Sequence, residues 1–77
     1  MNIMVILKNI TKPNDNISAD YYPEGKEPRG YMRLRIEDEK IVEHENVSTC
    51  AAVHVRYELR RLAKMENPPK EKTVLWY

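Results

Sequence analysis

The sequence predicts a single α+β domain, in which an antiparallel sheet of four to five strands carries one α-helix on a face, in the order β-β-β-β-α-β. The first observation is a helix-length run over residues 48–65, ended by Asn67, Pro68 and Pro69. The second is the short apolar run that follows it and ends at Tyr77. The third is the length, because 77 residues form one domain and no more.

The N-terminal half predicts strands separated by turns. Residues 3–7 are aliphatic and β-branched, which indicates a strand, and residues 11–16 form a polar turn cluster. A shorter strand is predicted over residues 17–22. Residues 23–30 contain both glycines and two of the five prolines, so they are predicted to form a loop.

A hairpin is the clearest local pattern, because residues 31–37 and 41–45 both alternate polar and apolar side chains. A three-residue loop over residues 38–40 gives one apolar face and one face with two charge pairs, whereas a two-residue loop mixes the faces. We therefore predict the three-residue register. Its facing pairs are Ile36 with Val42, Leu34 with His44, Arg35 with Glu43, and Arg33 with Glu45.

The helix is predicted to begin near Ser48 or Thr49, whose hydroxyls suit an N-cap, and to end near Glu66. At 100° per residue, six small or aliphatic side chains share one arc, which we expect to pack on the sheet. Glu58 lies at the edge of that arc and is expected to reach solvent or pair with Arg61. The members of the arc are Ala51, Ala52, Val55, Leu59, Leu62 and Ala63.

The opposite side of the helix is the candidate binding site. It combines cations with a valine and a tyrosine, although a purely solvated face needs neither. Three interpretations stay open: scattered surface apolar residues without a role, an anchor for a protein partner, and phosphate binding with base stacking on nucleic acid. The residues concerned are Val53, Arg56, Tyr57, Arg60, Arg61 and Lys64.

The first and last strands are apolar on both faces, although one helix covers only one face of a sheet. Ile3, Val5 and Leu7 alternate with Met4 and Ile6, and Leu75 and Tyr77 alternate with Val74 and Trp76. Either the loop over residues 23–30, with Tyr21 and Tyr22, or a second copy of the chain should cover the other face. We favour a homodimer through the open sheet face.

Charge and cysteine content narrow the class of protein. The net charge is +1, but residues 1–47 hold seven Lys/Arg and nine Asp/Glu, a balance of −2, while residues 48–77 hold six and three, a balance of +3. The single cysteine, Cys50, excludes a disulfide within the chain and favours a reducing compartment. The apolar N-terminal run stops at Lys8, too short for a membrane span. We expect a cytoplasmic protein that does not enter a membrane.

Residues for catalysis are sparse. Cys50 and His54 are four apart on the helix, a spacing that suits a thiolate with its base or two metal ligands, and His44 is the third candidate ligand. Glycine-rich phosphate loops and GxSxG are absent from the sequence. We therefore expect no catalytic residues, metal or cofactor. The predicted function is a small non-catalytic accessory or adaptor protein that binds a protein partner; the alternative is a nucleic-acid-binding accessory protein that uses the basic helix face.

Overall fold

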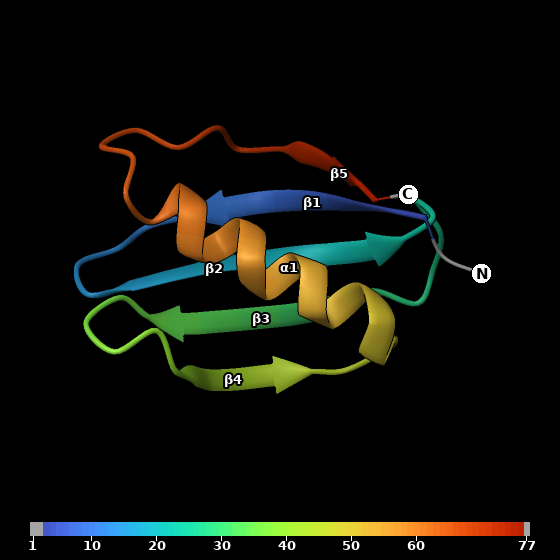
Figure 1. The fold of residues 1–77 in the computed structure, drawn as a ribbon, viewed down its shortest axis with the longest axis horizontal. Coiled ribbons are helices and arrows are strands. Elements are labelled where there is room, and N and C mark those ends of the chain that lie inside the picture. The colour runs from blue at the N-terminus through green and yellow to red at the C-terminus, as the bar shows by residue number, and fades with distance from the viewer. Residues whose placement is uncertain (1–2, 77) are drawn as a thin grey trace.

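The computed structural model describes residues 3–76 and has the predicted α+β fold. Its strands form one antiparallel sheet in the order β4-β3-β2-β1-β5, and the helix crosses one face of that sheet diagonally (Figure 1). The last strand returns, as predicted, and the structure places it beside the first. The elements are β1 (Met4–Thr11), β2 (Asn16–Pro23), β3 (Gly30–Arg35), β4 (Ile41–Glu45), α1 (Thr49–Leu62) and β5 (Lys72–Leu75).

The core lies between α1 and the three central strands. Alternate residues of β1, β2 and β3 point toward the helix, because successive side chains of a strand lie on opposite faces. On the helix, five residues of the predicted arc are buried, and Ala63 is half-buried against the same cluster, which confirms the arc. The buried strand residues are Val5, Leu7, Ile10, Ile17, Ala19, Tyr21, Met32 and Leu34.

The predicted start of the helix is confirmed, but the predicted end is not. Ser48 is the N-cap, and its Oγ accepts a hydrogen bond from the backbone N–H of Ala51 at 3.3 Å. The helix ends at Leu62 rather than near Glu66, because the next hydrogen bonds reach back only three residues. Met65, for example, donates its N–H to the carbonyl of Leu62 at 3.0 Å.

The predicted register of the hairpin between β3 and β4 is wrong. Strand β3 stops at Arg35, so residues 36–40 form a longer loop, closed by a bond from the Arg35 N–H to the Lys40 carbonyl at 2.9 Å. An irregularity beside Leu34 shifts the pairing further. The Arg33–Glu43 pair replaces both predicted charge pairs, with its ion-pair atoms 3.2 Å apart. The facing pairs are Tyr31 with Glu45, Met32 with His44, Arg33 with Glu43, and Leu34 with Ile41.

The sheet face away from the helix is partly covered by the segment between β2 and β3. A Cβ on Gly25 would lie 3.1 Å from Cδ1 of Ile6, so this segment packs on β1. The carboxylate of Glu24 accepts hydrogen bonds from the N–H groups of Ile3 and Met4 at 2.7 and 3.0 Å, and these bonds lower the pKa of Glu24. Tyr21 instead points into the core on the helix side.

Candidate functional site

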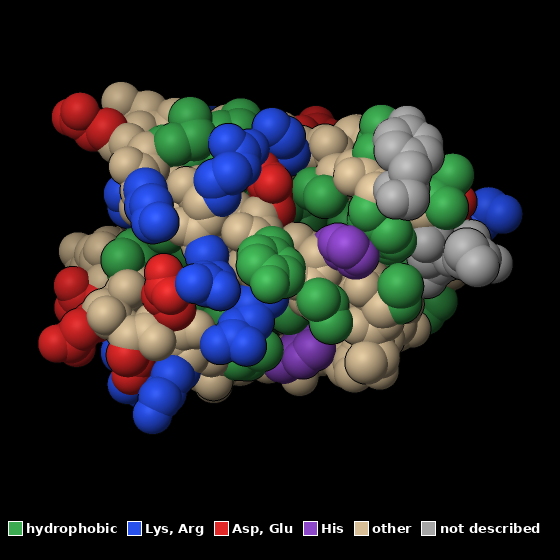
Figure 2. Space-filling model, viewed as in Figure 1, with side chains coloured by type: hydrophobic (Ala, Val, Ile, Leu, Met, Phe, Trp, Pro, Cys, Tyr) green, Lys and Arg blue, Asp and Glu red, His purple; other side chains and the backbone are tan. Residues whose placement is uncertain are grey.

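The helix face predicted as a binding site is exposed. Val53 and Tyr57, one turn apart on α1, expose 50% and 66% of their surface. In Figure 2 the Lys and Arg side chains gather over the C-terminal half of the helix, while hydrophobic and His side chains lie over its N-terminal half. All six predicted residues therefore lie on one side of the helix, at least partly accessible to a partner.

Three of the four cations on this face are held by acidic or carbonyl oxygens of the same chain. The Arg60 guanidinium is 3.0 Å from the Glu39 carboxylate. The Arg56 guanidinium donates to the backbone carbonyl of Glu39 at 3.2 Å. Arg61 forms an ion pair with Glu58, which was one of the two expected placements of Glu58, and this pair raises the pKa of Arg61 through hydrogen bonding and charge. Each of the three guanidinium groups therefore already has an oxygen partner within the chain.

Glu39 is the site residue that the sequence analysis missed. It lies in the loop between β3 and β4 with φ = 59°, in the left-handed region that non-glycine residues adopt infrequently. This backbone turns both its carbonyl and its carboxylate toward the helix. The sequence did not indicate that Glu39 contacts the helix, because the loop was predicted to span residues 38–40 and not residues 36–40.

Tyr57 forms the centre of a shallow hollow of about 300 Å³. The Arg60 guanidinium lies 5.8 Å from the centroid of the Tyr57 ring, within the range of a cation–π interaction. This contact leaves most of the ring exposed to solvent. The hollow is lined by Tyr57, Glu58, Arg60, Arg61 and Lys64.

The three residues considered for catalysis or metal binding have different contacts and do not form one site. Cys50 is a free, exposed thiol. His54 stacks on the indole of Trp76, with ring centroids 3.9 Å apart and planes at 11°. His44 places Nε2 2.8 Å from the hydroxyl of Tyr21, whose pKa is raised by burial. Within residues 3–76, no three His, Cys, Asp or Glu side chains are grouped closely enough to hold a metal ion.

Helix α1 has 14 residues, and no helix among residues 3–76 is long and apolar enough to cross a bilayer.

Comparison of the chain with protein-family models, with curated proteins and with solved structures gave no match. The function is therefore argued from the site itself.

Proposed function

We propose that this protein is a non-catalytic accessory or adaptor protein, which binds a protein partner through the face of α1 from Val53 to Lys64. The observation that carries the proposal is the exposure of Tyr57, a large aromatic ring one turn from the half-exposed Val53 and beside the Arg60 guanidinium. Tyrosine and arginine are enriched among the residues that dominate the binding energy of protein interfaces.

The ion pairs favour a protein partner over nucleic acid. Four cations lie on this face, but the carboxylates of Glu39 and Glu58 lie among them, within salt-bridge distance of Arg60 and Arg61. Binding to nucleic acid depends largely on cations that neutralise phosphates, and neighbouring carboxylates repel that backbone. A protein surface with complementary charges tolerates such a mixed pattern.

The proposal predicts that Tyr57→Ala weakens partner binding by about tenfold or more, as expected for a central aromatic anchor. The measurement is retention of a protein by the immobilised chain from a nuclease-treated extract, at low and at high salt. Lys26→Ala is the matched control, because Lys26 is exposed in the segment between β2 and β3, away from α1. Retention should survive high salt with the wild-type chain and the control, and be lost with Y57A.

Two results would contradict this proposal. If Y57A retains the protein as well as the wild-type chain does, the tyrosine face is not the interface. If retention requires nucleic acid and disappears steeply as salt rises, the nucleic-acid alternative replaces the proposal, because displaced counterions make phosphate binding strongly salt-dependent.

We also propose a homodimer through the sheet face opposite α1. That face carries four half-buried apolar or aromatic side chains, Met4, Ile6, Tyr22 and Tyr31, together with Leu75, which is 52% exposed. The segment between β2 and β3 covers Ile6, but it leaves Leu75 open. Exposed apolar side chains grouped on one face are typical of an interface between copies of a chain.

Sedimentation equilibrium at high micromolar concentration should therefore give twice the mass of one chain. Leu75→Lys should shift the equilibrium toward monomer, because it places a charge in the interface. Val53→Lys, which adds the same charge on the helix face, should leave the dimer intact. A wild-type chain that stays strictly monomeric would rule out the dimer.

A further inference from the structure

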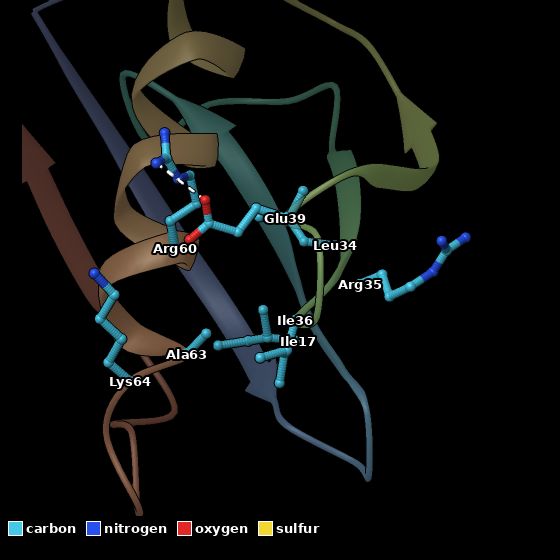
Figure 3. A pocket seen from close by; sticks show the side chains of 8 residues that line it. All are labelled: Ile17, Leu34, Arg35, Ile36, Glu39, Arg60, Ala63 and Lys64. Carbon is cyan, nitrogen blue, oxygen red and sulfur yellow. Dashed lines mark ion pairs between the residues drawn. The ribbon is translucent and has the colours of Figure 1, made fainter.

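A second hollow lies beside the proposed binding face, between the end of α1 and the loop that follows β3 (Figure 3). Its walls are aliphatic: Ile17 and Leu34 are buried beneath it, and Ile36 and Ala63 are half-buried at its sides. Its volume is about 100 Å³, compared with the roughly 30 Å³ that one water occupies in the liquid. A small branched side chain has room to enter.

The mouth of this pocket carries charge. Arg60 lines it from the last turn of α1 and Lys64 from the turn that follows the helix, and Glu39 lines it from the opposite side, with its carboxylate 3.0 Å from the Arg60 guanidinium. Arg35 points away in Figure 3 and pairs with Asp38 at 2.9 Å. Two cations and one carboxylate therefore face an incoming group. Lys64 forms no ion pair with any residue from 3 to 76.

We infer that this pocket seats an aliphatic side chain from an acidic segment of the protein partner, with an adjoining carboxylate of that segment on Lys64 and Arg60. The inference rests on the proposed function and specifies the chemistry of the partner. The aliphatic walls favour burial of a leucine-like side chain, and the excess of cations at the mouth selects against a basic segment.

Glu39 has a definite part in this arrangement. In the free chain the Glu39 carboxylate forms an ion pair with Arg60. A carboxylate of the partner would bind at the same position. The partner must therefore compete with an intramolecular acid, which reduces its apparent affinity. The aliphatic walls offer no hydrogen-bond partner to a base that enters between them, so its polar groups would be desolvated there without compensation.

The test is a titration of the ¹⁵N-labelled full chain with three short blocked peptides, followed by amide chemical shifts. The probe peptide is Glu-Leu-Glu-Glu; the second replaces leucine by serine, and the third replaces every glutamate by lysine. We expect saturable shifts at Ile36, Ala63 and Lys64 with the first peptide only. Equal shifts with the serine peptide would overturn the pocket, because the aliphatic side chain would then contribute nothing.

Three variants sharpen the result. Ala63→Leu fills the pocket and should abolish saturable binding. Glu39→Gln keeps the length of the side chain and the hydrogen bond from Arg56 to the backbone carbonyl of residue 39, but it removes the competing negative charge. The affinity for the peptide should rise about two- to fivefold, which corresponds to the free energy of an exposed ion pair. Lys26→Gln is the matched control, because it removes a cation from the segment between β2 and β3, away from α1 and outside the lining of the pocket.

The outcomes separate this inference from the proposed function. Unchanged or weaker binding in E39Q, or full binding in A63L, overturns the pocket. Shifts that cluster at Val53 and Tyr57 and ignore both variants would leave the helix face as a binding site and remove the pocket from it. The serine peptide and E39Q decide the matter even if A63L fails to fold.

Discussion

Gly30→Ala should lower the free energy of unfolding by about 3 kcal/mol, at the upper end of the usual range for overpacking a core. Gly30 lies directly opposite Tyr21 in the pairing of β2 with β3, and the tyrosine ring covers it. A Cβ on Gly30 would lie 2.4 Å from Cζ of that ring. A chain of 77 residues has a total stability of about 4–12 kcal/mol, so the loss should be visible as a large drop in the urea midpoint.

The ring has little freedom to move aside. Tyr21 is fully buried, and its hydroxyl contacts Nε2 of His44 at 2.8 Å and donates to the carbonyl of Glu45 at 3.2 Å. Displacing the ring would break these contacts at the edge strand β4. The new methyl group therefore forces either the ring or the backbone of β3 to shift.

A double-mutant cycle with Tyr21→Leu tests the mechanism, because leucine lacks the atoms that would clash with the new methyl group. The cost of Gly30→Ala should fall by more than about 1 kcal/mol in the Y21L background, an interaction energy typical of side chains in contact. Gly25→Ala is the comparison: Gly25 has φ = 72°, so its cost comes from the backbone and should not depend on Tyr21. Equal costs for G30A in both backgrounds would contradict the clash.

The pattern of the helix was predictable because it is local. Fourteen helical residues repeat their apolar positions often enough that the buried arc follows from the sequence alone. The apolar character of both faces of a strand did not fix its place in the sheet: β1 lies between β2 and β5, whereas β5, with the same pattern, is an edge strand. The length of the chain and the order of its elements then left few alternatives to an α+β fold.

The hairpin register was not predictable, because distant contacts decide where β3 ends. The N–H of Ile36 donates to the carbonyl of Asp15, in the turn between β1 and β2, at 2.8 Å. Glu39 is held against the helix through Arg60. Neither contact can be recognised from the alternation of polar and apolar residues in 31–45. That alternation depends only on how the side chains of the two strands face each other.

The same limit applies to the candidate site. The helical wheel found its six residues, because they share one side of α1. It could not find that Glu39 reaches them from another element, nor that Ile36 and Ala63 enclose a pocket between that element and the helix. Each of these features depends on the loop between β3 and β4, where the predicted register was wrong.

Leu59→Ala should lower the free energy of unfolding by about 2–5 kcal/mol. Leu59 is fully buried in the cluster between α1 and the sheet. The cost combines the lost burial of the side chain with the cavity that remains, since close-packed neighbours relax only in part. If the wild-type stability is near the lower end of its own range, a loss of about 5 kcal/mol would leave much of the protein unfolded without denaturant, as circular dichroism during urea titration would show.

Val53→Ala is the matched control, because it shortens an aliphatic side chain on the opposite face of the same helix. Val53 is 50% exposed, so the change should alter stability by no more than about 0.5 kcal/mol. Alanine also has the higher helix propensity, which offsets part of the lost contact. Similar losses for L59A and V53A would mean that Val53 is buried against another part of the chain. The proposed binding face would then be part of the core, and the functional proposal would fail with it.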